Sequence, residues 1–324
     1  MRVAVVILNY NGEGHLRRFL PSVVEHTPSF VDIIVADNGS SDSSCSLIRD
    51  HFSPRVELLA LDQNYGFAAG YNRALERLDH EIFLLLNSDV EVSANYIEPL
   101  LEELLSSDDI AAVGPKLRSV VEPNKFEYAG AAGGYIDFLG YPFCRGRIMN
   151  KTEVDHGQYD DSRDLFWVSG AAFCCRSSIY KSLGGFDGDF FAHMEEIDLC
   201  WRMQLAGYRI RIVPQSVVYH LGGGTLSTLS PFKTELNHRN NLAMLYKCAP
   251  TRQRITVAVV RPFLDLAAAL SYLCQGQVGA FNAVFKAWWG FLRWHKALNK
   301  KRRAIRSNVV AESKHIYNGS IFLK

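Results

Sequence analysis

The chain has 324 residues, 48% of them hydrophobic, which is enough apolar material for one large domain or two modest ones. Its 35 Lys and Arg nearly balance its 34 Asp and Glu, so the net charge of +1 provides no general attraction to nucleic acid, and none is expected as a partner. The seven cysteines form no Cys-x-x-Cys pair and predict free core thiols. Met1-Arg2 leads directly into an apolar run too short for a signal peptide, so the expected compartment is the cytoplasm.

Four short runs rich in Val, Ile and Leu predict buried strands in the first 90 residues. They are Val3–Leu8, Val31–Ala36, Val56–Leu61 and Ile82–Leu86. Helical periodicity between them predicts helices at His15–His26, Ser43–Phe52 and Tyr71–Leu78. Strands that alternate with helices indicate an α/β fold with a mostly parallel, Rossmann-like sheet, in which ligands bind at the carboxyl ends of the strands.

The middle of the chain is less regular. Residues 120–165 lack a sustained period and predict a long excursion over the active face. Order returns at Phe166, with a helix expected over Glu195–Ala206 and strand-like segments at Tyr208–Val213 and Ser216–Tyr219.

The composition changes after the three glycines at 222–224, so we expect a catalytic domain over residues 1–225 and a helical region over 226–324. Ile255–Leu273 is nearly apolar but contains two charged residues and a proline, which makes it a poor membrane-spanning helix. The aromatic stretch Val278–His295 runs directly into a basic stretch, and this pattern suits peripheral contact with the inner face of the cytoplasmic membrane. A packed helical subdomain with a solvated basic tail would give the same pattern.

Polar side chains follow three of the predicted strands. Asn9 and Asn11 follow the first, Asp37 ends the second, and Asn87 and Asp89 follow the fourth. Such side chains meet at one edge of a parallel sheet and can hold the base, ribose and phosphates of a nucleotide. The carboxylate of Asp89 is also a hard oxygen ligand suited to Mg²⁺ or Mn²⁺, although a turn Asp that caps a helix would look the same.

Two later groups extend this candidate site. His220 follows an apolar segment and can be a second ligand for Mn²⁺ beside Asp89, although a His at a strand end is commonly structural. Glu195, Glu196 and Asp198 lie at the predicted start of a helix, where the helix dipole alone favours acidic residues. Their mutual repulsion raises at least one pKa, which suits a general base. Asp198 is spaced to pair with the arginine four residues on.

Seven strings occur in a fixed order between residues 3 and 225. They are ILNYNG at 7–12, VADNGSSD at 35–42, NYGFAAGYN at 64–72, LLNSDV at 85–90, VSGAAF at 168–173, LGGFDGDFFAHMEEIDLCWR at 183–202 and VYHLGGGT at 218–225. Together they resemble glycosyltransferase family 2 with the GT-A fold, in particular its rhamnosyltransferase-like branch. The short motif His238-Arg239-Asn240 also resembles an Arg-Asn step that follows the catalytic domain in this family.

The resemblance implies inverting transfer of a sugar from a UDP-, dTDP- or GDP-sugar donor to a hydroxyl of a glycan or lipid-linked glycan acceptor, as in cell-surface polysaccharide synthesis. It also implies roles for single residues. Donor binding falls to Asn9, Asn11, Asp37, Asn64, Asn72, Asn87 and Asp89, with Asp37 at the base and Asn87 at the ribose. Metal binding falls to Asp89 and His220, and the acceptor side to Trp167, Ser169, Gly170 and Asp198.

Two positions depart from the family pattern. Asn87 replaces an Asp, but an amide still hydrogen-bonds a ribose. Glu196 stands where the family has its catalytic Asp, and its additional methylene extends the reach of the carboxylate by about 1.5 Å. Glu196 is therefore the first candidate for the base, and Glu195 is the alternative. A nucleotidyltransferase and a catalytically inactive sugar-binding scaffold remain as rival functions.

Overall fold

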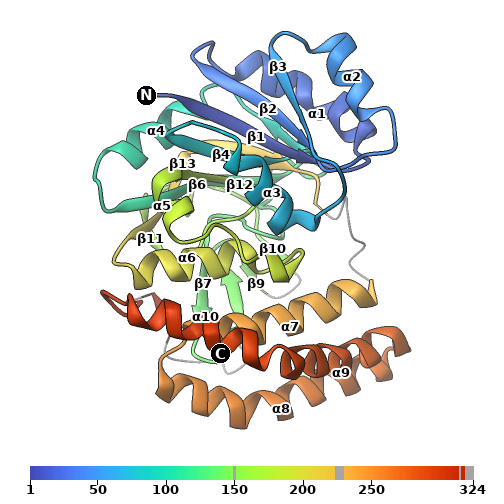
Figure 1. Ribbon diagram of the computed structural model, residues 1–324, viewed down its shortest axis with the longest axis vertical. Coiled ribbons are helices and arrows are strands. Elements are labelled where there is room, and N and C mark those ends of the chain that lie inside the picture. The colour runs from blue at the N-terminus through green and yellow to red at the C-terminus, as the bar shows by residue number, and fades with distance from the viewer. Residues whose placement is uncertain (149–150, 223–229, 314, 318–324) are drawn as a thin grey trace.

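The computed structural model describes residues 1–148, 151–222, 230–313 and 315–317 (Figure 1). Its central sheet contains β1 (Val3–Asn9), β2 (Val31–Asp37), β3 (Val56–Ala60), β4 (Ile82–Asn87), β5 (Val90–Val92), β6 (Ile110–Ser119), β11 (Arg163–Leu165), β12 (Ala172–Arg176) and β13 (Arg209–His220). The strand order is β11-β13-β6-β12-β4-β1-β2-β3, and β5 pairs with β13. The predicted α/β fold is confirmed.

The parallel half of the sheet agrees with the four predicted strands. The strands β3, β2, β1 and β4 are mutually parallel. Both faces of β1 are buried, because Val3 and Val5 belong to one apolar cluster and Ala4 and Val6 to the other. The intervening helices are α1 (Glu13–His26), α2 (Ser44–His51) and α3 (Gly66–Glu76). The last of these begins earlier than predicted, at Gly66, whose φ of 78° turns the chain into the helix.

The other half of the sheet is mixed. The strand β12 runs antiparallel to both β4 and β6, whereas β13 runs parallel to β6. The sequence predicted two separate strands where the structure has the single strand β13. The register of β13 shifts between Val213 and Val217, next to Pro214, which cannot donate a ladder hydrogen bond. The proline therefore interrupts the strand pattern without ending the strand.

The predicted excursion over residues 120–165 contains short strands. These are β7 (Gly134–Asp137), β8 (Pro142–Cys144), β9 (Arg147–Ile148) and β10 (Lys151–Thr152). The strand β7 also pairs with β14 (Ile316–Tyr317), so the end of the described chain returns to this excursion. All seven cysteines are free, as predicted, and five of them are buried core thiols, but Cys45 is half-buried and Cys274 is exposed.

The remaining helices form two groups. The first group lies between strands of the central sheet in chain order and contains α4 (Glu98–Leu105), α5 (Ser177–Ser182), the 3₁₀ turn η1 (Gly188–Phe190) and α6 (Glu195–Leu205). The C-terminal group is α7 (Pro231–Cys248), α8 (Thr251–Cys274), α9 (Val278–Arg293) and α10 (His295–Ser307), and it lies at the end of the molecule remote from β1–β3 (Figure 1). The helix α7 packs against α6, α9 and α10. The domain boundary at residue 225 stays a prediction and lies outside the described residues, as do Gly223 and Gly224.

Candidate active site

The carboxyl ends of β1 and β2 hold Asp37 in one orientation. Asn9 and Asp37 are register partners, and Asn9 Nδ2 donates a 3.0 Å hydrogen bond to Asp37 Oδ1. The backbone N–H of Ser40 donates to Asp37 Oδ2 at 2.9 Å, and the Ser40 hydroxyl accepts from the N–H of Asn11 at 2.8 Å. The buried carboxylate of Asp37 is therefore fixed at the sheet edge, with Asn9 and Asn11 as its supports.

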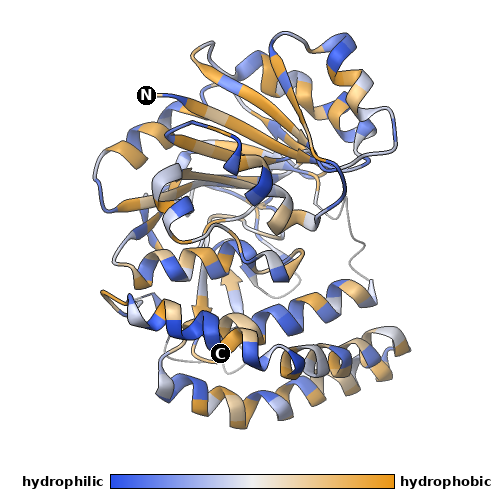
Figure 2. Cartoon of the chain, viewed as in Figure 1, coloured by the Kyte–Doolittle hydropathy of each residue, from blue (hydrophilic) through white to orange (hydrophobic). Residues whose placement is uncertain are grey.

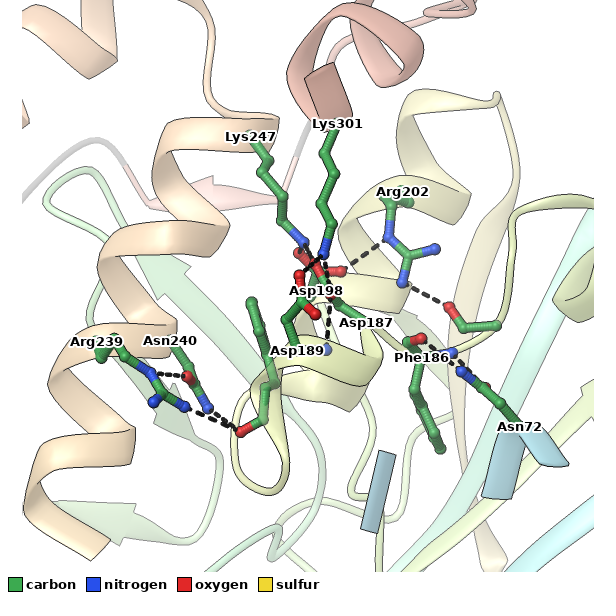
Figure 3. Close-up of polar contacts among 12 residues, drawn as sticks. Asn72, Phe186, Asp187, Asp189, Asp198, Arg202, Arg239, Asn240, Lys247 and Lys301 are labelled. Atoms are coloured by element: carbon green, nitrogen blue, oxygen red, sulfur yellow. Dashed lines mark hydrogen bonds and ion pairs between the residues drawn. The ribbon is translucent and has the colours of Figure 1, made fainter. Parts of the chain in front are cut away.

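The loop before α3 is held by side-chain amides. Asn64 Oδ1 accepts hydrogen bonds from Asn38 Nδ2 at 3.0 Å and from Gly66 N at 2.8 Å. Asn72 Nδ2 donates to Phe186 O at 2.8 Å (Figure 3). Asn72 Oδ1 accepts from Tyr180 Oη at 2.6 Å. Both ends of the Asn72 amide are therefore used inside the protein, and its contact with the donor stays a prediction.

The ends of β4 and β13 bring Asn87, Asp89 and His220 together. His220 Nε2 lies 3.2 Å from Asp89 Oδ1 and 3.5 Å from Asn87 Nδ2. On the opposite side of the ring, His220 Nδ1 lies 3.4 Å from Glu127 Oε1. Burial lowers the pKa of His220, but the two flanking carboxylates outweigh it and raise that pKa to about 10. The imidazolium in turn lowers the pKa of Asp89, although burial acts in the opposite direction.

Glu127 is a site residue that the sequence analysis missed. It lies in the excursion between β6 and β7, and its side chain is buried. Its Oε2 accepts a 2.6 Å hydrogen bond from the N–H of Ala129, which orients the other oxygen toward His220. A single Glu in an irregular segment carries no local signal, so only the fold reveals this contact.

The pair Asp89 and His220 fits a hard divalent ion. Among the residues that the structure describes, no group of three or more His, Cys, Asp or Glu side chains forms a metal centre. The pair nevertheless offers a carboxylate oxygen and an imidazole nitrogen side by side, and Mg²⁺ or Mn²⁺ completes such a set with phosphate oxygens and water. Metal binding needs neutral imidazole, so the ion would replace the proton on His220.

Glu196 has the properties of a general base. It is partly exposed at the start of α6, whereas Glu195 is buried, and each residue has an Oε2 without a hydrogen-bond partner. Burial raises the pKa of Glu196 to about 7, and burial together with the charge of Glu196 raises the pKa of Glu195 well above its ordinary value. Of the two candidates we favour Glu196, because the residue is partly exposed whereas Glu195 is buried.

Glu196 is close to the nucleotide-binding strand ends. A Cβ placed on Gly170 would lie 3.6 Å from Glu196 Cβ, so the backbone of Gly170 is in contact with this side chain. The next residue, Ala171, accepts a 2.9 Å hydrogen bond from the N–H of Asn87. The end of β4 and the start of α6 therefore border one region.

The other residues predicted on the acceptor side have internal contacts. Trp167 is 3% exposed, and its Nε1 donates to Tyr135 O at 3.0 Å. The Ser169 hydroxyl donates to Ala129 O at 3.1 Å. Because both side chains are buried and bonded within the protein, we correct their predicted acceptor contacts to support of the segment before Gly170.

Asp198 also needs correction. It is fully buried, and its Oδ2 accepts a 2.8 Å hydrogen bond from Arg202 Nε, which confirms the predicted pairing. Its Oδ1 lies 2.7 Å from Lys247 Nζ on α7. Because no oxygen of Asp198 reaches solvent, it cannot contact an acceptor, and its role is to join α6 to α7 (Figure 3).

The segment 187–194, which leads into α6, is held by the C-terminal helices (Figure 3). Asn240 Nδ2 on α7 lies 2.9 Å from each of the carbonyl oxygens of Phe190, Ala192 and His193. Phe191 O accepts from the N–H of Phe67 at 2.7 Å, which joins the same segment to the start of α3. Lys247 and Lys301 both pair with Asp187, at the beginning of the segment. The sequence motif at 238–240 singled out Asn240, but it did not reveal that this side chain binds the segment before α6.

Residues 4–164 match Glycosyl transferase family 2. The chain is 29% identical over 234 residues to the N-acetylglucosaminyl-diphospho-decaprenol L-rhamnosyltransferase of Mycobacterium tuberculosis (strain ATCC 25618 / H37Rv), and this similarity covers 67% of the chain and 75% of that protein.

Two solved structures have a similar fold. The structure of GalNAc-T7 with UDP, GalNAc and Mn²⁺ has a TM-score of 0.60 at 16% identity, over 76% of this chain and 48% of that one. The structure of S. aureus TarS 1–349 with UDP-GlcNAc has a TM-score of 0.57 at 13% identity, over 95% of this chain and 91% of that one.

Proposed function

Because this chain belongs to glycosyltransferase family 2, in its rhamnosyltransferase-like branch, we propose a sugar transfer in which the donor lies across the ends of β1, β2 and β4. The chain is a glycosyltransferase with a GT-A fold, and it uses a nucleotide sugar in the synthesis of cell-surface glycans. Each oxygen of Asp37 already accepts one hydrogen bond, from Asn9 or from Ser40, but a carboxylate oxygen can accept two. In our proposal Asp37 uses this remaining capacity to accept a hydrogen bond from the nucleotide base, and the amide of Asn87 bonds the ribose.

Asp89 and His220 would hold a divalent cation at the end of β4. Such an ion, when bound, neutralises the charge that develops on the departing diphosphate. The support for this role is the donor set, in which a carboxylate oxygen and an imidazole nitrogen lie 3.2 Å apart. Glu127 orients the imidazole from its other nitrogen, as carboxylates do for histidine ligands in general.

Glu196 would accept the proton of the acceptor hydroxyl. As the proton moves to a Glu196 carboxylate oxygen, the hydroxyl oxygen forms a bond to the anomeric carbon from the face opposite the nucleotide, and the bond from that carbon to the diphosphate oxygen breaks. Inversion at the anomeric carbon follows from this single displacement. A base is most effective when its pKa is near the working pH, and the pKa of Glu196 is raised to about 7.

One observation carries this proposal: Glu196 borders the strand end that holds Asn87 and Asp89. The contact of Gly170 with Glu196 and the hydrogen bond from Asn87 N to Ala171 O bring the predicted base and the predicted metal ligand to one edge of the sheet. An inactive scaffold has no need for a buried carboxylate oxygen without a hydrogen-bond partner at this place, and Glu196 Oε2 is such an atom.

We further propose that the acceptor is a lipid-linked glycan presented at the inner face of the cytoplasmic membrane. The support is the name of the mycobacterial relative, whose acceptor is a sugar joined through a diphosphate to decaprenol. The donor is a UDP-, dTDP- or GDP-sugar.

The test is transfer from a panel of these three donor classes to a polyprenyl-diphosphate-linked sugar, with and without Mn²⁺, followed by mass spectrometry of the lipid. Asp89→Ala should abolish both transfer and Mn²⁺-dependent stabilisation by the donor nucleotide, whereas Glu196→Gln should abolish transfer alone. Full transfer by Glu196→Gln would disprove the assignment of the base. Transfer that is equally fast in EDTA would disprove the metal site.

A further inference from the structure

The helix α8 buries two charged side chains against the protein and exposes a stripe of apolar side chains to solvent. Arg261 and Asp265 are each 1% exposed, although charged residues are rarely buried. Six large apolar residues of the same helix are exposed, at spacings of three and four that place them on one stripe. They are Ile255, Val259, Phe263, Leu266, Leu270 and Leu273, and Phe263 is 71% exposed.

The buried charges fix this orientation. Arg261 Nη1 donates to Asn241 Oδ1 on α7 at 2.6 Å, and Arg261 Nη2 lies 3.2 Å from Asp265 Oδ1. The indole N–H of Trp288 on α9 donates to Asp265 Oδ2 at 3.0 Å. A rotation of α8 that turned the apolar stripe toward the protein would break the hydrogen bonds of Arg261 and Asp265. A buried charged group without a partner costs several kcal/mol, so this rotation is unfavourable. The exposed stripe is therefore a permanent feature of the folded chain.

The helix α9 extends the apolar surface. It packs against α8, and its exposed apolar residues are Val278, Phe285, Trp289 and Leu292, with Trp289 at 65% exposure. Next to the two helices lies a shallow groove formed by residues of α7, α8, α9 and α10. Its lining residues are Tyr246, Arg254, Ile255, Ala258, Phe291, Leu292, His295 and Leu298. Figure 2 shows apolar residues along both helices, at the end of the molecule remote from β1–β3. Exposed apolar surface of this extent indicates a binding face.

The charge of this region identifies the occupant. Residues 251–307 contain 11 Lys and Arg against a single acidic residue, the buried Asp265, so their net charge is +10. The rest of the chain contains 24 Lys and Arg against 33 Asp and Glu, a net charge of −9. Exposed basic residues border the apolar face, among them Lys286, Arg293, Lys296 and Lys300. A second copy of the same face would meet it with like charge, whereas anionic lipid headgroups complement it.

We propose that the outward face of α8 and α9 is a membrane-docking surface, embedded in one leaflet of an anionic bilayer. The helix α8 is, among the described residues, the one that is long and apolar enough to cross a membrane, and 22% of its apolar window is buried. It does not cross in this proposal, because Arg261 and Asp265 hold it against α7 and α9. Amphipathic helices with basic flanks bind in this interfacial manner. The inference extends the proposed function by naming the surface that brings the site to a lipid-linked acceptor.

Vesicle binding by the full chain tests the proposal without using catalysis. The chain should co-sediment with vesicles of phosphatidylcholine and phosphatidylglycerol and bind pure phosphatidylcholine at least tenfold more weakly. The double variant Phe263→Glu/Trp289→Glu should lose at least tenfold in binding to anionic vesicles. Lys296→Ala should lose about fivefold, the effect expected of one basic residue near a charged membrane. The matched control is Phe30→Glu, a 60% exposed aromatic residue on the catalytic part of the chain, which should bind like the unmodified protein.

Three outcomes would overturn the proposal. The first is a monomeric, folded chain that does not bind anionic vesicles. The second is a dimer in vesicle-free solution that Phe263→Glu/Trp289→Glu converts to monomers, which would make the face an interface between copies. The third is protein that resists extraction from vesicles by alkaline carbonate, which would show that α8 crosses the bilayer. If sugar transfer fails while vesicle binding succeeds, the proposed function is wrong and the docking surface stands.

Discussion

Asn240 offers the sharpest test of how the C-terminal helices serve the active site. One buried amide nitrogen lies 2.9 Å from the carbonyl oxygens of Phe190, Ala192 and His193, just before the helix that begins with Glu195 and Glu196. In Asn240→Ala, these carbonyl groups lose that donor. Phe190 O retains the N–H of Ala192 at 2.8 Å, so the loss falls mainly on the other two groups. At about 1–3 kcal/mol for each buried group without a partner, we expect the free energy of unfolding to fall by about 2–6 kcal/mol.

The same substitution should slow catalysis. Phe191, His193 and Met194 have φ values of 65°, 70° and 72°, which cost about 1–3 kcal/mol each in a residue with a side chain. Without the amide, the segment can relax toward less strained backbone angles and displace Glu196. A displacement of about 1 Å at a catalytic group reduces kcat about 100-fold. We therefore expect kcat to fall about 100-fold, with KM for the donor nearly unchanged.

The neighbouring Asn241 provides the control. It is also a buried amide on α7, but its Nδ2 donates to Gly140 O at 2.6 Å and its Oδ1 accepts from Arg261, both away from α6. Asn241→Ala should lower the Tm by several degrees and leave kcat on a soluble acceptor within about twofold of the unmodified enzyme. If Asn240→Ala lowers the Tm to the same extent but retains kcat, its amide is a stabilising contact only, and its positioning role is refuted.

Three further predictions follow from the site. Glu196→Gln should lower kcat about 10²- to 10⁴-fold. In the unmodified enzyme kcat should rise with pH through about 7 as Glu196 loses its proton, and the pH–rate profile of the Gln variant should lack this rise. Asp89→Ala should remove the increase in Tm that Mn²⁺ adds to nucleotide binding, as measured by thermal shift; an unchanged increase would exclude Asp89 as a ligand. Lys247→Met should lower the free energy of unfolding by about 3–5 kcal/mol, because the buried carboxylates of Asp187 and Asp198 lose this cation. Chemical denaturation measures the change, and a loss below about 1 kcal/mol would show that Lys247 does not stabilise the two carboxylates.

The features that could be predicted from the sequence are those that depend on residues close together in the chain: single strands, the residues at strand ends, and pairs within one helix. The apolar run Val3–Leu8 became β1, and the polar residues that follow three parallel strands met at one edge, because strand direction alone brings such residues together. The pairing of Asp198 with Arg202 followed from helical spacing. Each of these inferences needs only a local pattern and the geometry of one element.

The remainder depends on contacts between distant segments. Glu127 reaches His220 only because β6 and β13 pair and carry the following excursion over the sheet. The sequence placed Asp198 on the acceptor side because acidic residues gather at the start of α6. In the structure its second carboxylate oxygen pairs instead with Lys247, 49 residues later in the chain. When a polar residue is buried against a partner far away in the sequence, the spacing of apolar residues in the two segments gives no sign of the contact. Sequence patterns therefore assign such polar residues to ligand binding too readily.

Two adjacent residues of α7 join the two features on which the proposed transfer at a membrane depends. Asn240 bonds the segment that leads to Glu196, and Asn241 bonds Arg261 on the helix whose outer stripe is apolar. Side chains one position apart on a helix diverge by about 100°, so a single rigid helix can bond both neighbours at once. If Glu196 is the base and the outer face of α8 and α9 docks to a bilayer, as we propose, the Glu196 carboxylate needs a fixed height above the lipid, because its own reach is a few ångströms. In the proposed docking, the run of polar contacts from Arg261 through α7 to the start of α6 would fix that height, together with apolar residues of α7 such as Met244 and Leu245 that share the core of the sheet.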